Sequence, residues 1–421
     1  MTREELYDIA RGLQEQFEDK AQEVCQTVYD FAELGLQEYK SSAYLKQELA
    51  ALGFRVSENS GGLPTAFMAE YGEGHPKVAF LAEYDALPGY GPDHDQNGHA
   101  CGHNWIAANC FGACQILKEM YDQGLFTGTI VYAGTPAEES VGGKINMVEA
   151  GCFDDCDLSM QIHIGKGDDS ELGAQYLAMD SLLFTYHGLS SHAAGAPERG
   201  INALDACYLT FNGVNALRQH VTPDTRIHGI ITNGGLAPNV VPALAQSKWY
   251  VRAADRAYVN ELVEKVINCA KGGALMAGAT VDYEFVENGF DNLKSQPELI
   301  SVFGECFKAA GVPAEHVKTS LREPSGSSDV GNVSWACPTV GSNMGIGNQD
   351  GASCHEEVFL PNCTGPVGFA GLKKAILAQT FFALEAYTDP ALQQKLSEIK
   401  ARLTEERKAI AGQSRVHVTV L

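Results

Sequence analysis

The stretch VAFLAEYDALP, residues 78–88, decides the fold class of this chain. Its first five residues are all apolar, which is typical of a strand buried on both faces of a sheet. Asp85 follows that strand directly. In open α/β sheets, ligands bind beyond the carboxyl ends of the strands. The stretch therefore predicts a central strand and a functional edge beside it.

Two further apolar runs repeat this arrangement. The run 129–133 is followed by the adjacent acids Glu138 and Glu139, and the run 158–162 is followed by His163. Each predicted strand thus delivers polar side chains at its carboxyl end. Because parallel strands share one such edge, we expect these side chains to lie close together.

Helical periodicity surrounds these strands, so the chain is predicted to be α/β. Residues 2–52 form helices, followed by short strands at 54–56 and 66–69. Residues 89–97 are a polar loop. Further helices are expected over 105–123, 144–150, 297–310, 364–388 and 392–403.

The pattern changes after residue 180. Strands at 181–187, 227–232, 246–253 and 280–286 alternate with helices at 202–219 and 258–274. This β-α-β-β-α-β order is that of a ferredoxin-like unit. We therefore expect a discontinuous catalytic domain over 1–179 and 291–421, with a mixed sheet and an inserted α+β lid domain over 180–290.

The turn from Gly98 to Asn104 holds two residues suited to binding metal. Cys101 and His103 are preferred ligands of zinc and similar metals. The neighbouring glycines let the backbone fold closely around an ion. Taken alone, the two residues also fit an ordinary loop cysteine and a structural histidine.

The remaining candidate ligands are Glu139, His163 and His355. With Cys101 and His103 they make five, more than one tetrahedral ion uses, which indicates two metal ions sharing a ligand. The side chains of the adjacent acids Glu138 and Glu139 diverge, so one can bind metal while the other acts as a general base. The alternative for Glu138 is a helix capping box that begins at Thr135.

Asp85 is a candidate partner that holds a ligand imidazole in one tautomer. Its alternative role is that of a turn residue ahead of Pro88.

Composition excludes several functional classes. The net charge of −23 argues against nucleic acid or an anionic membrane surface as a partner. No stretch of about 18 apolar residues is evident, and the N-terminus does not resemble a signal peptide. The 12 cysteines are scattered, which favours reduced thiols and a cytoplasmic location. Serine-hydrolase and nucleotide-binding motifs are absent.

Taken together, the motifs resemble those of the aminoacylase/carboxypeptidase family of metallopeptidases. Within that family the chain is similar to the amidohydrolase branch, which includes p-aminobenzoyl-glutamate hydrolases and small dipeptidases. The resemblance covers nearly the whole chain. Its motifs lie at 82–88, 98–104, 134–139, 188–197, 202–205, 234–242 and 326–334.

The resemblance implies a role for each candidate residue. It assigns the metal ligands to Cys101, His103, Glu139, His163 and His355. It makes Glu138 the general base and His192 of the lid an oxyanion-stabilising residue that often acts across a dimer. It places Asn239, Ser327 and Ser328 near the substrate. Most peptidases of the wider family have an aspartate as the bridging ligand where this chain has Cys101. A thiolate is a softer ligand, and zinc is expected first, with manganese or cobalt as alternatives.

The predicted function is hydrolysis of amide or peptide bonds in small substrates by a metal-activated water. Such substrates are dipeptides and N-acyl or aminobenzoyl amino acids, and the expected assembly is a homodimer formed through the lid. The alternative is a non-catalytic metal- or ligand-binding protein that retains the fold.

Overall fold

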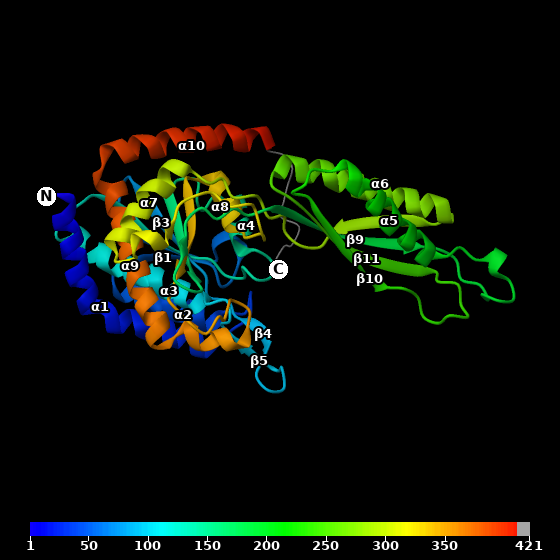
Figure 1. Ribbon diagram of the computed structural model, residues 1–421, viewed down its shortest axis with the longest axis horizontal. Coiled ribbons are helices and arrows are strands. Elements are labelled where there is room, and N and C mark those ends of the chain that lie inside the picture. Colours follow the sequence, from blue (N-terminus) through cyan, green and yellow to red (C-terminus); the bar gives the residue numbers. More distant parts are fainter. Residues whose placement is uncertain (411–421) are drawn as a thin grey trace.

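The computed structural model describes residues 1–410, which form two lobes (Figure 1). The larger lobe holds an eight-stranded mixed sheet, in the order β1-β2-β6-β3-β7-β14-β8-β13. The smaller lobe holds a four-stranded sheet in the order β10-β11-β9-β12. The predicted α/β class, with a mixed sheet in one lobe and an α+β unit in the other, is confirmed.

The predicted central strand lies in the middle of the large sheet. β3 (Lys77–Ala82) pairs in parallel with β6 (Gly128–Gly134) on one side and β7 (Leu158–Gly165) on the other. β7 in turn pairs in parallel with β14 (Thr339–Gly345). β6 also pairs antiparallel with β2 (Phe67–Glu73), which in turn pairs antiparallel with β1 (Arg55–Glu58). The carboxyl ends of β6, β3, β7 and β14 therefore meet at one edge.

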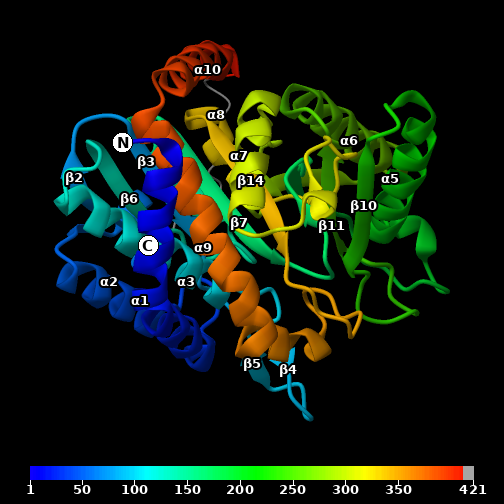
Figure 2. The ribbon, with the colours of Figure 1, turned by 60° about the vertical axis from the view of Figure 1, so that its left-hand side comes forward.

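Alternate residues of β3 pack into different cores. Val78 and Phe80 join the core shared with α1 (Arg3–Phe31), α3 (His103–Asp122) and α9 (Gly365–Thr388). Figure 2 shows α1 and α9 side by side on that face.

The opposite face of β3 has its own core. Ala79 and Leu81 pack there with residues of α4 (Gly143–Glu149) and α8 (Val330–Ala336). Burial on both faces explains why β3 is a continuous apolar run.

Helix α9 meets the length and hydropathy criteria for a membrane span. This corrects the expectation that no such stretch exists. In the structure, 72% of its most apolar window is buried, because the helix packs in the core of the larger lobe.

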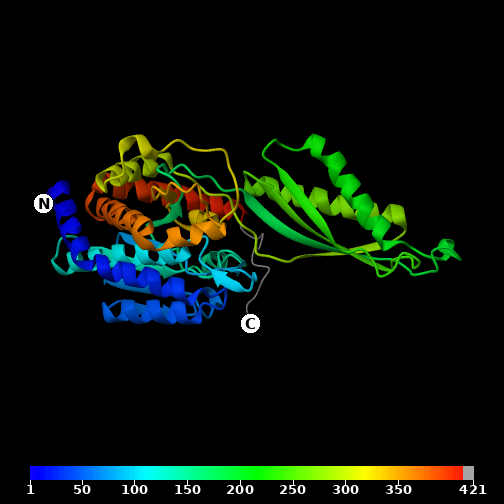
Figure 3. The ribbon, with the colours of Figure 1, turned by 60° about the horizontal axis from the view of Figure 1, so that its bottom comes forward.

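The smaller lobe, called the lid below, places two helices on one face of its sheet (Figure 3). Its strands are β9 (Ala178–His187), β10 (Arg226–Asn233), β11 (Leu244–Ala253) and β12 (Thr280–Phe285), and its helices are α5 (Ala203–Leu217) and α6 (Arg256–Ala277). Their apolar residues form a separate core around Trp249. The predicted domain limits stay a prediction, and residues 411–421 of the outer segment lie outside the described residues.

Several elements differ from the sequence prediction. The predicted loop at 89–97 forms a hairpin of β4 (Leu87–Tyr90) and β5 (Gln96–Gly98). The small and polar residues of β14 lack the apolar run that marks a buried strand, so β14 was not predicted. Two-residue strands such as β8 (Ser170–Glu171) and β13 (Val317–Lys318) leave no sequence signal. The other elements are α2 (Tyr39–Ala51), α7 (Pro297–Ala309), α10 (Pro390–Ile410) and the 3-10 helices η1 (Ser60–Gly62), η2 (Pro197–Arg199), η3 (Arg218–His220), η4 (Ala314–His316) and η5 (Glu357–Cys363).

A buried ion-pair network ties the functional edge of the sheet to two helices. Lys144, in α4, donates from Nζ to Glu83 Oε1 at 2.6 Å and to Asp329 Oδ1 at 2.7 Å. Its backbone N–H also donates to Asp329 Oδ2 at 3.0 Å. Glu83 directly follows β3, and Asp329 precedes α8. The side chains are at most 2% exposed, so this ammonium compensates both buried carboxylates, and Glu83 Oε2 also lies 3.4 Å from His103 Nε2.

We expect Lys144→Met to lower the free energy of unfolding by about 3–5 kcal/mol, because it leaves Asp329 buried without a cation and leaves Glu83 with only the imidazole of His103. The measurement is the urea midpoint by circular dichroism. Lys46→Met is the matched control, since Lys46 forms a 2.7 Å ion pair with the exposed Glu58. That change should cost less than about 1 kcal/mol. Equal shifts for both variants would contradict the assignment.

Candidate metal centre

The five predicted ligands converge at the carboxyl edge of the large sheet. Cys101 Sγ lies 3.4 Å from His163 Nε2 and 3.3 Å from His355 Nε2. His355 Nε2 lies 3.0 Å from Glu139 Oε1. Cys101, His103 and His163 offer ligand atoms within 4.8 Å of one another, and so do Cys101, Glu139 and His355. The two groups share Cys101.

Local backbone geometry explains how Cys101 and His103 reach the same site. His103 is the first residue of α3, and Gly102 before it has φ +74°. A Cβ at Gly102 would lie 2.3 Å from Cγ2 of Ile164. The close approach to β7 and the left-handed backbone both require glycine here.

Asp85 connects two of the ligands. His103 Nδ1 donates to Asp85 Oδ1 at 2.7 Å, and the backbone N–H of Glu139 donates to Asp85 Oδ2 at 3.0 Å. The first bond places a proton on Nδ1, so Nε2 is the nitrogen that would bind a metal. Nε2 is buried and makes no hydrogen bond within residues 1–410. A buried imidazole nitrogen without a partner fits a metal ligand.

His163 is oriented in the same way. Its Nδ1 donates to the carbonyl oxygen of Ile164 at 2.7 Å, which leaves Nε2 free beside Cys101. The donor set is thus one cysteine sulfur, three imidazoles and one carboxylate. These residue types suit borderline divalent metals, and the two overlapping groups have room for a pair of ions with one shared ligand.

Glu138 lies beside these ligands and lines the same cavity of about 950 Å³. Burial raises the pKa of Glu138 well above its usual value, and the carboxylates of Glu83 and Asp329 add to the rise. For Glu139, burial is outweighed by contact with His355 and by the charge of His103, so its pKa falls to about 2. The two adjacent acids therefore occupy different electrostatic environments.

The turn that carries the two acids is held by a residue that the sequence did not single out. Ala137 has φ +62°, and its backbone N–H donates to Glu38 Oε1 at 2.8 Å. Thr65 donates to the other oxygen of Glu38 at 2.9 Å. Helix α4 begins only at Gly143, so the alternative capping box at 135–138 does not form. The buried carboxyl of Glu38 instead fixes a left-handed turn.

His355 also occupies an unusual backbone conformation, with φ +73°. Its backbone N–H donates to the carbonyl oxygen of Ala100 at 2.9 Å. Tyr90 of the β4–β5 hairpin donates to the His355 carbonyl oxygen at 3.1 Å. The hairpin that replaces the predicted loop thus supports the last ligand. The preceding residue, Cys354, also lines the cavity, and a hydrogen bond with Cys101 and the nearby histidines lower its pKa to about 6.

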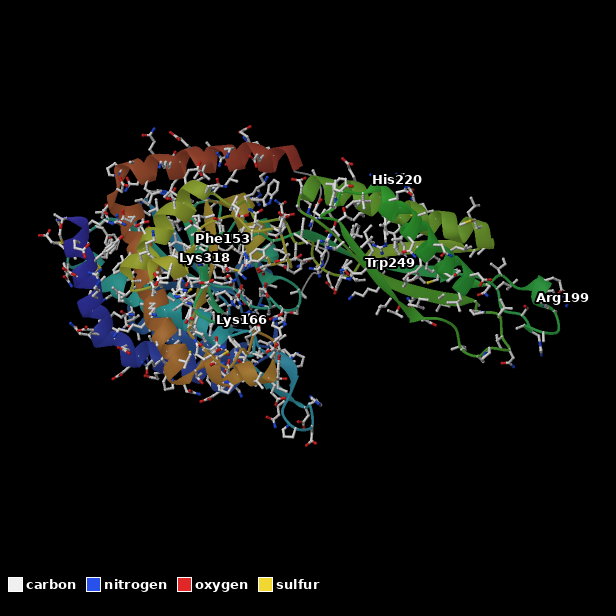
Figure 4. All side chains as sticks on the ribbon, in the orientation of Figure 1. Phe153, Lys166, Arg199, His220, Trp249 and Lys318 are labelled. Carbon is white, nitrogen blue, oxygen red and sulfur yellow. The ribbon has the colours of Figure 1, made fainter. Side chains whose placement is uncertain are left out.

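The predicted substrate residues fall in two places. Ser327 and Ser328 line the cavity. His192 and Asn239 lie together in the lid, where His192 forms a bridge with Val240. In Figure 4, Arg199 marks the tip of this part of the lid, far from Lys166 at the cavity. Within one chain, the structure does not bring His192 or Asn239 to the metal ligands.

Comparison with known proteins agrees with this geometry. Residues 79–366 match the model of peptidase family M20/M25/M40. The chain is 33% identical to the Xaa-Arg dipeptidase of Mus musculus, over 96% of this chain and 95% of the relative. It is 34% identical to one of the p-aminobenzoyl-glutamate hydrolase subunits of Escherichia coli, over 67% of this chain and 61% of the relative.

Solved structures share the fold. The aminobenzoyl-glutamate utilization protein of Klebsiella pneumoniae has a TM-score of 0.68 at 20% identity, covering 90% of this chain and 98% of its own. A dinuclear metal binding peptidase of the M20 family from Bacillus subtilis has a TM-score of 0.65 at 19% identity, covering 88% of this chain and 99% of its own. The resemblance noted in the sequence is confirmed: the chain belongs to peptidase family M20/M25/M40 and is a hydrolase of that family.

Proposed function

We propose that this hydrolase cleaves the amide bond of a dipeptide or an N-acyl amino acid whose leaving part carries a free carboxylate. The observation that carries the proposal is the position of Glu138, next to the ligand Glu139 and within the cavity that the ligands line. Two divalent ions, with zinc expected and manganese or cobalt as alternatives, would be held by Cys101, His103, Glu139, His163 and His355.

Bound metal ions would supply Lewis acidity, which polarises the carbonyl and acidifies a water molecule. The chain supplies the proton transfers. Glu138 accepts the proton of the attacking water and returns it to the leaving amine. Asp85 holds His103 in the tautomer that presents Nε2.

Arg252 of the lid supports a substrate with a carboxylate. It lines a hollow of about 340 Å³ that adjoins the metal centre and also contains Glu138 and Glu139. Its guanidinium donates to Ser327 Oγ at 3.1 Å, whereas its Nε is buried without a hydrogen-bond partner in the described part of the chain. The nearby Glu287 is already paired with Lys248 at 2.7 Å. A substrate carboxylate would satisfy the free donor.

The named relatives are consistent with this substrate class. One is called an Xaa-Arg dipeptidase and another a p-aminobenzoyl-glutamate hydrolase subunit. The substrates in both names release an amino acid, which carries a carboxylate next to the amine that leaves. We propose the same chemistry for this chain, without specifying the side chain of the released amino acid.

We further propose that a second copy of the chain completes the site. β11 runs from Leu244 at the far end of the lid to Ala253 at the junction with the larger lobe. The eight residue steps from Leu244 to Arg252 span about 26 Å of extended strand. His192 lies near the far end, so it cannot reach the metal centre of its own chain in this conformation. A partner's lid would have to supply it.

The surface of the lid supports a dimer. β10 is an edge strand, whose open backbone groups favour pairing with another strand. Large apolar side chains are exposed on β10 and on the loop that follows it: Ile230, Ile231, Leu236 and Val240. His192 Nδ1 accepts from the N–H groups of Ala194 and Gly195, which assigns the proton to Nε2 as a free donor. All 12 cysteines are free, which supports the proposed cytoplasmic location.

The first test removes the base without removing the metal ligands. Glu138→Gln should lower kcat by about 100-fold or more, because the amide cannot accept the proton. Metal content, measured by plasma mass spectrometry, should stay at the wild-type value. The substrates are dipeptides ending in Arg or Glu, and p-aminobenzoyl-glutamate. Near-normal turnover by a metal-loaded variant would remove Glu138 from this role.

The second test addresses the carboxylate. Arg252→Met should raise KM by about 10- to 100-fold, the loss expected for one hydrogen bond to a charged group. Against the matching dipeptide amide, wild type and variant should perform alike, since no carboxylate is present. For the dipeptide, Arg252→Lys should have a KM between those of wild type and Arg252→Met. If Arg252→Met raises KM as much for the dipeptide amide as for the dipeptide itself, Arg252 does not bind the carboxylate.

The third test asks whether His192 acts across a dimer. Mixing His192→Ala subunits with Glu138→Gln subunits creates hybrids in which one metal centre has both an intact base and an intact partner histidine. We expect the mixture to regain up to about a quarter of wild-type activity, as random subunit exchange allows. Subunit exchange is verified by native mass spectrometry. Confirmed hybrids without activity would rule out action in trans.

A further inference from the structure

Cys354 is a thiol of the metal centre for which the proposed chemistry has no use. It precedes the ligand His355 and lines the same open cavity as Cys101. The side chains of Cys354 and Cys101 are in hydrogen-bonding contact. Cys354 Sγ also lies 3.8 Å from the carbonyl oxygen of Ile164, the residue that follows the ligand His163.

The backbone holds the two thiols together. The N–H of His355 donates to the carbonyl oxygen of Ala100, so the segments that carry Cys354 and Cys101 run side by side. Cys101 Sγ is also within 3.4 Å of two imidazole nitrogens. A disulfide requires the Cβ atoms to be about 3.5–4.5 Å apart, so it forms only between cysteines whose backbone segments lie this close together.

The other ten cysteines lie outside this cavity. Eight of them are buried, and Cys152 and Cys269 are half-buried at other places in the fold. An oxidant that enters the cavity therefore meets Cys101 and Cys354 first. This pair differs from the rest because both thiols line one open cavity, and access decides which thiols an oxidant reaches.

We propose that Cys101 and Cys354 form a redox pair, in which a hydroperoxide converts the two thiols to a disulfide and withdraws the Cys101 sulfur from the metal centre. The inference rests on the proposed function for one step, the use of Cys101 as a ligand. Disulfide formation itself depends only on the contact between the two thiols.

The chemistry balances with a hydroperoxide as the oxidant. The Cys354 thiolate attacks the outer peroxide oxygen, the O–O bond breaks, and an alcohol and a sulfenic acid form. The Cys101 thiol then attacks the sulfenic sulfur, the S–S bond forms, and water leaves. The two thiols together lose two electrons and two protons, and the peroxide is reduced to alcohol and water. A dithiol reductant reverses the step.

The structural consequence is loss of the shared ligand. Cys101 belongs to both ligand groups, so its oxidation removes one donor from each. A disulfide sulfur is a far weaker ligand than a thiolate. Oxidation should therefore release metal and stop hydrolysis together.

The experiment treats three metal-loaded proteins with tert-butyl hydroperoxide: wild type, Cys354→Ser and Cys152→Ser. Cys152 is a half-buried cysteine outside the cavity and serves as the matched control. The readouts are peptide mapping under non-reducing conditions, metal release to a chromogenic chelator, and activity before and after dithiothreitol with added metal. Peptide mapping is repeated on metal-free protein, so that it does not depend on any catalytic role.

We expect a Cys101–Cys354 cross-linked peptide from wild type and from Cys152→Ser, with metal released in parallel. Dithiothreitol with added metal should remove the cross-link and restore activity. Release from Cys354→Ser should be slower by about tenfold or more, because the thiol that attacks the peroxide is missing. Cross-links to other cysteines, or release from Cys354→Ser at the wild-type rate, would overturn the proposal. A cross-link without metal release would keep the thiol pair but remove Cys101 from the ligand set. Wild type without the cross-link would overturn the redox pair whatever the activity.

Discussion

Carboxylates crowd the carboxyl edge of the large sheet, and their repulsion must be offset by nearby cations. The five acids are Glu83, Asp85, Glu138, Glu139 and Asp329. Lys144 pairs with two of them, His103 with a third and His355 with a fourth. Glu138 has no ion pair within the described residues. A site with more buried acids than built-in cations favours binding of further positive charge, and metal ions supply it.

This concentration of charge depends on the topology. β6, β3 and β7 are parallel neighbours, so the residues that follow them share one edge. Asp329 and His355 come from a segment that returns only after the chain has built the lid. Lys144 and its pair with Asp329 join the two halves of the larger lobe directly beside Glu138. The ion-pair network thus places the metal centre at the seam of a discontinuous fold.

Much of the fold and of the metal centre could be predicted, because the sequence patterns that indicate them are local. An apolar run followed by an acid or a histidine indicates a buried strand and its edge, and this identified Asp85, Glu138, Glu139 and His163. The ligand pair Cys101 and His103 stands out by its spacing.

The rest depends on pairing across long separations, which one sequence does not reveal. Lys144 had the pattern of an ordinary helix residue until the structure placed it between Glu83 and Asp329. Glu38 acts on a turn 99 residues away, and nothing in its neighbourhood indicates burial. Arg252 follows a regular strand pattern, and only its end of that strand faces the cavity.

The two ends of the lid carry different residues of functional interest. Arg256 is fully buried at the junction, where it pairs with Asp180 and Asp291 and anchors the start of α6. Arg252, four residues earlier, is held by the same junction and belongs to the cavity of its own chain. His192 belongs to the free end of the same sheet. Under the proposed function, Arg252 would recognise the substrate carboxylate within one chain, whereas the His192 donor at the other end of the sheet would serve a neighbouring chain.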